Sequence, residues 1–551
     1  MILGIDIGGT HTDAVCINEK NIVATAKALT GKDLVSSILE VARALGIDYS
    51  AIGRVVLSTT LSTNAIIERK YAPTGMIVSA GPGIDPRKYF LSDDFYLADG
   101  AIDHRGREYI PINKDQVTGI ADELKGKGIA GVGIVSKFSV RNSAHETMIR
   151  SLIEKDFENI SMGHTMSGSL NFHRRLNTTY FNTAVMPVQM HFVESVRRAL
   201  QELGIHCPML FLKADGGTYS SSAADRLPVE TILSGPAASM MGAVALCADP
   251  RTTTLVLDVG GTTTDIGVLI NGIPVLEPTG VSIHGLKTLV RGLKVVSVGT
   301  GGDSFVHLDG DTLCVGPQRQ GPPAVMGGSD PTPMDAFAVL GEFDQGDRNR
   351  AHEAVSSIAV KLGREVEDVA REIISVMVRN IKARAFDFID EVNRHPVYTI
   401  HEMLYPELVE PKQIMVIGGP ARQLKSYIEE VFGLECIVPD HAMVANALGA
   451  ALARTTAQIT MLADTQLKRL VCPELGIEDE VSSRLSLEDL KRMGEEAIRN
   501  NAAYLGLKDE IEISILEEQS FNMVRGFSTT GKNMRLKIQT RPGIIREWSP
   551  Q

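Results

Sequence analysis

One short sequence occurs twice in this chain and constrains its fold more than any other feature. The first copy occupies residues 6 to 13 as DIGGTHTD, and the second occupies residues 258 to 265 as DVGGTTTD. Six of the eight positions are identical, and apolar runs flank both copies. This pattern predicts a β-strand, a Gly-Gly turn and a second β-strand at each place.

Such a hairpin is suited to binding phosphate. Paired glycines let backbone N–H groups face an anion, because no Cβ stands in the way, and the threonines add hydroxyl donors. Asp6 and Asp258 end the first strand of each hairpin, where a carboxylate can hold a hydrated Mg²⁺. Two facing hairpins would grip the β- and γ-phosphates of a nucleotide; the alternative is two tight turns that bind nothing. The hairpin residues predicted to line the nucleotide site are Gly8, Gly9, Thr10, His11, Thr12, Gly260, Gly261, Thr262, Thr263 and Thr264, of which all but His11 are expected to bind phosphate.

Length and composition narrow the class of protein. A chain of 551 residues is too long for one core, so two or three domains are expected. The net charge of −12, without a Lys/Arg-rich block, argues against nucleic acid as a partner. No apolar run approaches the roughly 20 residues that span a bilayer, and the N-terminus enters a strand directly, so a cytoplasmic protein without membrane contact is expected. The six cysteines form no CxxC pair and the histidines show no ligand spacing, so neither residue type predicts a metal site.

Strand-like and helix-like segments alternate along the chain, which predicts an α/β architecture. A long amphipathic helix is expected at residues 365–392, and a helix rich in small residues at 441–454. From about residue 457 we expect a small α+β region, with a helix capped by Ser486 and strands at 510–516 and 534–538. Further strands are predicted at 55–57, 76–80, 131–137, 209–213, 295–298 and 414–417, and helices at 34–45, 145–157 and 191–203.

Hydroxyl-rich and glycine-rich segments follow several of these strands, where ligands commonly bind in α/β sheets. The segment at residues 58–65, STTLSTNA, lies between a strand and a predicted helix. It can bind an anion or a polar substrate at the helix N-terminus, or Ser62 or Thr63 can simply cap the helix. Asp215 and Ser234 lie in similar turns, for which a purely structural role is the alternative.

The paired motif is similar to the two phosphate motifs of the actin-like ATPase fold, which sugar kinases, heat-shock chaperones and actin share. The form GIDIGGTHTDAV, followed by STTLSTNAIIER, resembles the hydantoinase A/5-oxoprolinase family. Further segments with this resemblance are RRLNTTYFN at 174–182, ADGG at 214–217, SGPAAS at 234–239 and GTGGDS at 299–304. The resemblance extends over most of residues 2 to 455. Asp303 replaces a family glycine, and residues 321–327 depart from the family pattern, which warns against transferring a substrate.

The resemblance implies an α/β, two-lobed actin-like ATPase with ribonuclease H-like duplicated lobes and ATP with Mg²⁺ in the cleft. We expect an N-terminal lobe at 1–245, a second lobe at 246–456 and a small C-terminal α+β region at 457–551. Asp6 and Asp258 are expected to hold Mg²⁺ through water, and Asp13 and Asp265 to shape the loops or orient a nucleophile. Residues expected beside the nucleoside are Gly299, Gly301, Gly302, Gly418, Gly419 and Pro420, and substrate-side candidates are Thr59, Thr60, Asn64, Asp215 and Ser234.

Family members use ATP to activate an unreactive carbonyl group. The resemblance therefore implies an ATP-dependent hydrolase subunit that acts on a cyclic amide of the hydantoin, 5-oxoproline or lactam type by phosphorylating its carbonyl oxygen. The alternatives are an ATP-dependent ketone carboxylase subunit, a small-molecule kinase of the same fold and a non-catalytic, chaperone-like ATPase. Because family members commonly work with a separate B-type subunit, a hetero-oligomer is expected.

Overall fold

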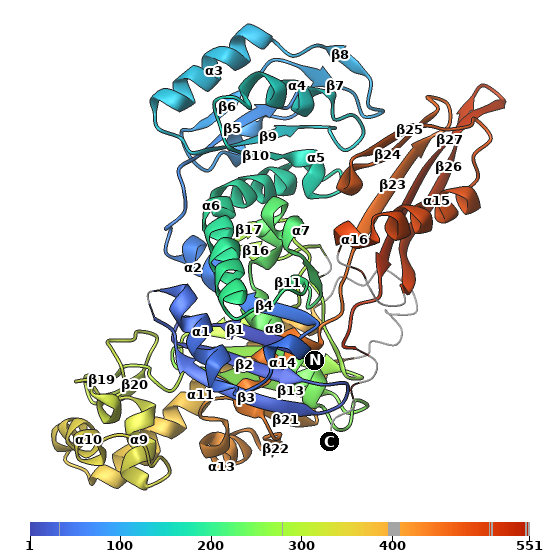
Figure 1. The fold of residues 1–551 in the computed structure, drawn as a ribbon. Coiled ribbons are helices and arrows are strands. Elements are labelled where there is room, and N and C mark those ends of the chain that lie inside the picture. Colours follow the sequence, from blue (N-terminus) through green and yellow to red (C-terminus); the bar gives the residue numbers. More distant parts are fainter. Residues whose placement is uncertain are drawn as a thin grey trace.

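The computed structural model describes residues 1–551 except 32, 278, 395–407, 506, 508–510, 546–547 and 549–551. It confirms the mixed α/β class, with two lobes at the base of Figure 1, a further sheet above them and an appendage at one side. Among the described residues, none of the helices combines the length and apolar character that crossing a bilayer requires.

The first lobe is built on a six-stranded sheet of order β12-β11-β4-β1-β2-β3. Strand β1 runs antiparallel to β2 and parallel to β4, and β4 runs parallel to β11. The carboxyl ends of β1, β4 and β11 therefore lie at one edge, where α/β sheets bind ligands. Helix α1 (Leu34–Ala44) covers part of this sheet. The strands are β1 (Ile2–Ile7), β2 (His11–Ile17), β3 (Ile22–Leu29), β4 (Arg54–Thr59), β11 (Met209–Leu212) and β12 (Thr218–Ser220).

The second lobe repeats the same order and strand directions. Its sheet runs β15-β14-β13-β21-β22, with β13 antiparallel to β14 and parallel to β21, so β13 corresponds to β1 and β21 to β4. The short strand β18 (Val296–Val298) also pairs with β14. The main strands are β13 (Thr254–Val259), β14 (Thr264–Ile270), β15 (Ile273–Pro274), β21 (Gln413–Gly418) and β22 (Glu435–Ile437).

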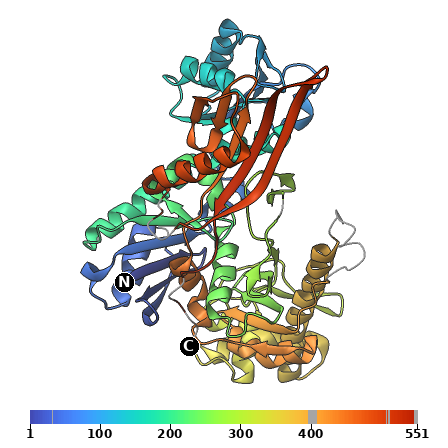
Figure 2. The ribbon, with the colours of Figure 1, turned by 90° about the vertical axis from the view of Figure 1, so that its right-hand side faces the viewer.

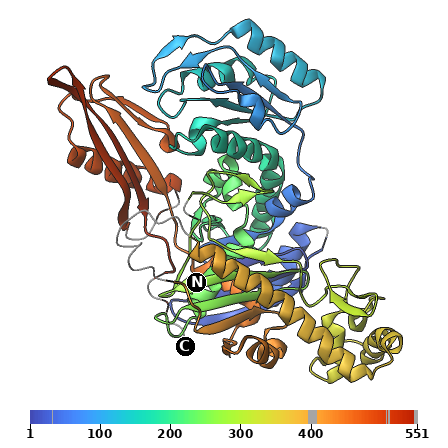
Figure 3. The same ribbon diagram turned by 180° about the vertical axis from the view of Figure 1, so that it is seen from behind.

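Helix α11 (Val366–Asn393) is the long helix that the apolar spacing predicts, and Figure 3 shows it crossing the back of the molecule. Val369, Ile373 and Met377 are fully buried on its inner face, which confirms the prediction. The described helices of this lobe also include α9 (Pro333–Leu340), α10 (Arg348–Leu362) and α13 (Ala421–Phe432).

The predicted N-terminal range 1–245 contains a second large sheet in addition to the six-stranded one. A separate four-stranded sheet, of order β10-β9-β5-β6, lies at the top of Figure 1 and packs with helices α3 (Lys114–Gly126) and α4 (Ala144–Ile153). Its strands are β5 (Thr74–Ser79), β6 (Phe95–Leu97), β9 (Gly131–Ser136) and β10 (Asn159–Met162).

Helix α6 (Phe172–Glu202) runs between this sheet and the first lobe and is much longer than the predicted segment 191–203. Its first half is rich in buried threonine and lacks an apolar stripe. Thr178, Thr179 and Thr183 donate their hydroxyls to carbonyl oxygens one turn earlier, at 2.7 to 2.8 Å. Because the helix itself satisfies these hydroxyls, a polar sequence can be buried there.

The appendage is a five-stranded antiparallel sheet of order β25-β24-β23-β27-β26 with helix α15 (Leu487–Asn500) against it. Ser486 caps α15 as predicted, in a reciprocal pair with Asp489. The two predicted tail strands are parts of a longer hairpin, which Figure 2 shows running along the molecule. The strands are β23 (Gln458–Asp464), β24 (Arg469–Cys472), β25 (Ile477–Glu480), β26 (Ile513–Arg525) and β27 (Ser528–Thr540).

Two helices of small residues, α8 (Ser234–Leu246) and α14 (Ala445–Leu452), pack against each other where the lobes meet. A Cβ added at Gly242 would lie 2.2 Å from the carbonyl oxygen of Ala445, and one at Gly449 would lie 2.3 Å from that of Ala238. On its other side α14 contacts β1, where a Cβ on Gly4 would lie 2.2 Å from the carbonyl oxygen of Ala447. Small residues therefore let these elements approach closely, and the helix predicted at 441–454 is present as α14.

Candidate active site

The two predicted phosphate hairpins form and have the same backbone geometry. The amide of Gly8 donates to the carbonyl oxygen of His11 at 3.0 Å, and the amide of Gly260 donates to that of Thr263 at 2.9 Å. Asp6 pairs with Asp13 across the first hairpin, as Asp258 pairs with Asp265 across the second. The turn residues Gly9, His11, Thr262 and Thr263 are exposed.

The carboxylates of Asp6 and Asp258, one from each lobe, lie close enough to influence each other. Burial raises the pKa of Asp6 to about 6; the hydrogen bond from Ser58 opposes this rise, and the charges of Asp13 and Asp258 add to it. The Ser58 hydroxyl donates to Asp6 at 2.5 Å, and the Ser239 hydroxyl donates to Asp258 at 2.5 Å. The hairpins therefore share one site.

Asn446, at the start of α14, connects the two carboxylates. Its amide nitrogen donates to Asp258 at 3.2 Å, and a hydrogen bond from Asn446 also lowers the pKa of Asp6. The helix that packs between the lobes thus contributes a polar side chain to both.

This arrangement fits a hydrated divalent cation. Within the described part of the chain, no Lys, Arg or His forms an ion pair with Asp6 or Asp258, although the two negative groups are close together. The described residues also contain no cluster of three or more His, Cys, Asp or Glu side chains that could hold a metal by themselves. Two carboxylates supplemented by water and phosphate oxygens would match the coordination habit of Mg²⁺.

The second aspartates of the two hairpins have different neighbours. Asp13 forms an ion pair with Lys27 at 2.8 Å; burial raises the pKa of Asp13, and Lys27 opposes the rise. Asp265 instead accepts a hydrogen bond from the Ser297 hydroxyl at 2.5 Å. Burial and the nearby charge of Asp258 raise the pKa of Asp265 to about 7.

Thr12 and Thr264 do not face the cleft, contrary to prediction. Both are fully buried. The hydroxyl of Thr12 bonds to that of Thr30 at 2.9 Å, and the hydroxyl of Thr264 donates to the carbonyl oxygen of Thr300 at 2.7 Å. These hydroxyls hold neighbouring loops in place, so in this arrangement they are not free to bind phosphate.

The segment from Gly299 to Asp303 packs directly on the second hairpin. The amides of Gly302 and Asp303 donate to the carbonyl oxygens of Gly260 and Gly261, at 2.9 and 2.6 Å. A Cβ at Gly301 would lie 2.6 Å from the Gly260 oxygen, which explains the glycine. The Asp303 carboxylate lies over Gly261 and pairs with Arg319 at 2.9 Å. Contact of Gly299, Gly301 and Gly302 with a nucleoside stays a prediction.

The turn from Gly418 to Pro420 joins β21 to α13 beside Asp258. Gly418 has a φ of +96°, and a Cβ there would lie 2.3 Å from the carbonyl oxygen of Val259 and 2.8 Å from Asp258 Oδ1. Gly419 is exposed at the start of α13. This place is compatible with the predicted nucleoside contact.

Of the substrate candidates, Thr60 and Asn64 lie beside the first hairpin. Helix α2 (Leu61–Ile67) begins inside the hydroxyl-rich segment 58–65, so Ser62 and Thr63 lie within the helix and neither caps it. Asn64 donates to the Thr60 hydroxyl at 3.3 Å, and its amide nitrogen would lie 3.7 Å from a Cβ on Gly9.

Thr59 and Ser234 are fully buried and have partners within the protein. The Ser234 hydroxyl donates to the Thr59 carbonyl oxygen at 2.8 Å, and the Thr59 hydroxyl accepts from the amide of Leu61 at 3.1 Å. They join the starts of α8 and α2 and do not face a ligand, which corrects their prediction as direct contacts. Asp215 lies elsewhere, in a recess beside the appendage.

Four residues that position the aspartates were not predicted as site residues: Lys27, Ser58, Ser239 and Asn446. Ser58 belongs to the hydroxyl cluster at 58–65, and Asn446 is a polar residue in a segment of small apolar ones, so both left a signal in the sequence. Ser239 ends the SGPAAS segment, which resembles the family but predicted no role for this serine. Lys27 left no signal, because it reaches Asp13 only through the pairing of β2 with β3.

Comparison with known proteins agrees with the family resemblance of the sequence motifs. Residues 175–459 match the hydantoinase/oxoprolinase family model, and residues 2–157 match the model of the hydantoinase/oxoprolinase N-terminal region. The chain is 24% identical over 524 residues to the caprolactamase subunit alpha of Pseudomonas jessenii, covering 87% of this chain and 72% of that protein. It is 24% identical over 443 residues to the acetone carboxylase beta subunit of Xanthobacter autotrophicus, covering 69% of this chain and 61% of that protein.

An uncharacterized protein of Methanocaldococcus jannaschii is 25% identical over 427 residues, covering 68% of this chain and 62% of that protein. This chain thus spans about six tenths of the length of two of these three relatives. Among solved structures with this fold, nucleotide-free acetone carboxylase has a TM-score of 0.73 and 18% sequence identity, and the match covers 99% of this chain and 88% of the other. The ATP-dependent caprolactamase of Pseudomonas jessenii has a TM-score of 0.71 and 21% sequence identity, and the match covers 100% of this chain and 89% of the other. The family models together account for most of the chain, which belongs to the hydantoinase/oxoprolinase family.

Proposed function

We propose that this chain is the ATP-using subunit of an enzyme that opens a cyclic amide, with an actin-like ATPase site between the two lobes. The observation that carries the proposal is the shared site of Asp6 and Asp258, one from each phosphate hairpin, connected through Asn446. Related proteins include a caprolactamase subunit and a 5-oxoprolinase, the latter 23% identical over 416 residues. Both names denote action on a cyclic amide, which supports this substrate class.

In the proposed reaction, the γ-phosphoryl group of ATP passes to the carbonyl oxygen of the amide. The bond between this phosphorus and the bridging oxygen breaks, ADP leaves, and a new phosphorus–oxygen bond forms on the substrate. Water then adds to the activated carbon, and loss of phosphate with cleavage of the carbon–nitrogen bond opens the ring. Catalysis of this kind depends mainly on positioning and on neutralising phosphate charge.

The described residues fit these tasks. Backbone amides of the exposed turns at Gly9 and Thr262 would bind the phosphates, and Asp6 and Asp258 would hold Mg²⁺, which supplies charge neutralisation when bound. Thr60 and Asn64, beside the first hairpin, are placed where the acceptor would meet the γ-phosphate.

A ketone carboxylase subunit is the second candidate, since the acetone carboxylase beta subunit is also 24% identical, although over 443 residues rather than the 524 matched by the caprolactamase subunit. In that reaction the same phosphoryl transfer would trap the enol form of a ketone.

We also propose a partner subunit of the B type, because several relatives are named as subunits.

The experiment is an ATP hydrolysis assay of the chain purified with its co-purifying partners. Phosphate release is measured with hydantoin, 5-oxoproline, caprolactam and acetone, with and without bicarbonate. The proposal predicts release that depends on a cyclic amide and not on bicarbonate. Dependence on ketone and bicarbonate would establish the carboxylase instead, and release indifferent to all of these compounds would refute both.

A further inference from the structure

An arginine and an aspartate form an ion pair beside the second phosphate hairpin. A terminal nitrogen of Arg319 donates to Asp303 Oδ2 at 2.9 Å. Asp303 occupies a position where the family pattern has a glycine. The pair is therefore a feature of this chain that the shared motif does not explain.

The backbone fixes Asp303 against the turn of the hairpin. Its amide donates to the carbonyl oxygen of Gly261 at 2.6 Å. A Cβ added at Gly261 would lie 2.7 Å from Asp303 Oδ2 and 3.5 Å from Oδ1, so the whole carboxylate lies against this glycine. The acid thus borders a turn that we propose to bind phosphate, where an uncompensated negative charge would repel the ligand.

Backbone contacts also hold Arg319 at this place. The amide of Phe305 donates to the carbonyl oxygen of Gln318 at 2.8 Å, and the amide of Gly316 donates to that of Phe305 at 2.9 Å. The segments that carry Asp303 and Arg319 are therefore joined directly next to the ion pair. The position of the guanidinium group follows from the fold and not only from the reach of a long side chain.

The guanidinium group has donors left for a second anion. It carries five N–H donors. Within the part of the chain that the structure describes, the hydrogen bonds of Arg319 go to Asp303 alone. The side chain of Arg319 is 33% exposed and that of Asp303 is 13% exposed, so the arginine is the more accessible member of the pair.

Lys27, the cation beside the first hairpin, is engaged differently. Its ammonium group contacts both carboxylate oxygens of Asp13, at 2.8 and 2.9 Å. Burial lowers the pKa of His11 in that hairpin, and the charges of Lys27 and Arg319 lower it further. The charge of Arg319 thus also acts on the first hairpin, which agrees with a guanidinium group that faces the space between the two.

We propose that Arg319 is a phosphate ligand of the ATP site and that Asp303 positions it. In this arrangement the guanidinium group donates to the terminal phosphate between the hairpins and also neutralises the carboxylate beside Gly261. Arginine suits this task because its planar fork can bind two phosphate oxygens at once. The inference rests on the proposed function in one respect, since it takes the hairpins to bind ATP.

The test is calorimetric binding of AMPPNP and ADP in the presence of Mg²⁺. Arg319→Met should weaken AMPPNP binding by at least about tenfold, as expected for the loss of a hydrogen bond to a charged group, and should weaken ADP binding less. Arg319→Lys, which keeps the charge but not the fork, should lie between wild type and Arg319→Met. Equal weakening of both nucleotides, or wild-type AMPPNP affinity in Arg319→Met, would overturn the contact with the terminal phosphate.

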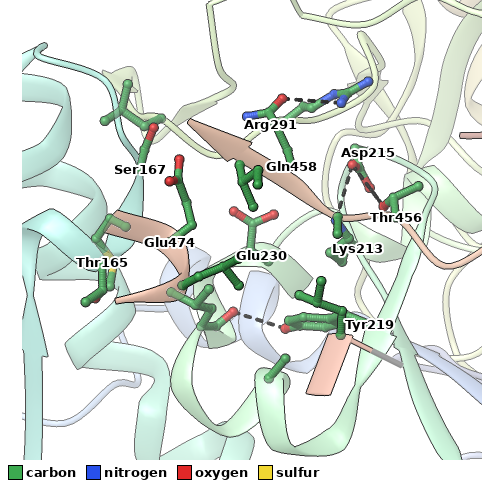
Figure 4. Close-up of a pocket in the computed structure, with 18 of the residues that line it drawn as sticks. Thr165, Ser167, Lys213, Asp215, Tyr219, Glu230, Arg291, Thr456, Gln458 and Glu474 are labelled. Atoms are coloured by element: carbon green, nitrogen blue, oxygen red, sulfur yellow. Dashed lines mark hydrogen bonds and ion pairs between the residues drawn. The ribbon is translucent and has the colours of Figure 1, made fainter. Parts of the chain in front are cut away.

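Arg291→Met is the matched control. Arg291 belongs to the same predicted lobe but lies in the recess beside the appendage (Figure 4), where it donates to Gln458 and Gln539. Two chambers, of about 120 and 500 Å³, share Arg291 as a lining residue, and their other lining residues include Glu230 and Lys537. This variant should bind AMPPNP and ADP as wild type does. A loss of AMPPNP binding equal to that of Arg319→Met would show a general effect of removing an arginine and would contradict the proposal.

Asp303→Gly restores the family residue and separates positioning from neutralisation. It removes both the partner that positions Arg319 and the charge that repels phosphate, so it should change AMPPNP affinity less than Arg319→Met does. The double variant should bind AMPPNP more tightly than Arg319→Met and more weakly than wild type. Affinity no better than that of Arg319→Met would contradict the neutralisation of Asp303. Full recovery would mean that Arg319 serves Asp303 and not phosphate.

Failure of this inference and failure of the proposed function give different results. Unchanged AMPPNP binding in Arg319→Met, with phosphate release that depends on a cyclic amide, counts against Arg319 alone. The predicted binding changes, with phosphate release indifferent to cyclic amides, count against the proposed function alone. No binding of AMPPNP to wild type would refute the ATP site on which both depend.

Discussion

The two phosphate hairpins have nearly the same sequence and the same turn hydrogen bond, yet their surroundings differ. In the first, Asp13 is balanced by Lys27, and the turn at Gly9 is flanked by Asn64. In the second, Asp265 accepts a hydrogen bond from the Ser297 hydroxyl, and the segment from Gly299 to Asp303 covers one side. A repeated motif thus specifies a backbone, whereas neighbouring segments specify how its carboxylates are charged and what they can reach.

The largest expected effect concerns Asp6 and Asp258, the two aspartates that we propose to serve one site. Asp258→Ala should reduce ATP turnover by at least about 10²-fold while the fold survives, since removing charge stabilisation from a transition state typically costs that much. Asp6→Ala should do the same, because both aspartates serve one site. Turnover is measured as phosphate release, with circular dichroism as the check on folding. Wild-type turnover in either variant would show that the hairpins are not equivalent in function.

Asn446→Leu should reduce turnover by about tenfold, because a side chain of similar size then leaves both aspartates without a shared hydrogen bond. Ser239→Ala, which removes a hydrogen bond from Asp258 and none from Asp6, is the comparison and should have a smaller effect. Steady-state phosphate release under saturating ATP measures both. A larger loss in Ser239→Ala would mean that the connection between lobes is unimportant.

Lys27→Met should lower the free energy of unfolding by about 1–3 kcal/mol, since it leaves the buried Asp13 without its charged partner. Denaturant unfolding at pH 7.5 measures this. Lys27→Met combined with Asp13→Asn should recover much of the loss, because no unpaired charge then stays buried. If the double variant is less stable than Lys27→Met, the ion pair is not the cause.

The last expected effect is a gradual pH dependence of the second hairpin. The pKa of Asp265 is raised from an ordinary 3.8 to about 7, so the folded protein holds this proton more tightly than the unfolded chain does. Its contribution to stability is therefore complete below about pH 4 and is lost as the pH rises towards 7. Without nucleotide, Asp265→Asn should lose less thermal stability than wild type between pH 5 and 8. If the melting temperatures of Asp265→Asn and wild type fell equally between pH 5 and 8, the raised pKa of Asp265 would be contradicted.

The sequence predicted those parts of the molecule that depend on local pattern. The hairpins, the β21 turn and helix α11 follow from paired glycines and apolar spacing. It could not show that the side chains of Thr12 and Thr264 are buried, because the motif does not reveal which of its threonines face the protein interior. Nor could it place Lys27 or Ser239, whose roles arise only when separate strands and helices meet.

The separate sheet within residues 1–245 and the recess beside the appendage were also unforeseen. Helix α6 was underestimated because its buried threonines satisfy their own hydroxyls, so no apolar stripe marks it. The recess depends on residues as far apart as Glu230 and Lys537, neither of which lies in a recognisable motif.

The central claim is that Asp6 and Asp258 serve one Mg²⁺–nucleotide site, and a double-mutant cycle on ATP binding tests it most directly. Calorimetric affinity for the non-hydrolysable ATP analogue AMPPNP is measured with and without Mg²⁺ in wild type, Asp6→Asn, Asp258→Asn and the double variant. The account predicts that either single variant loses the Mg²⁺-dependent part of binding and that the double variant loses no more. Losses that add independently, or Mg²⁺ dependence that survives in both single variants, would contradict a shared site.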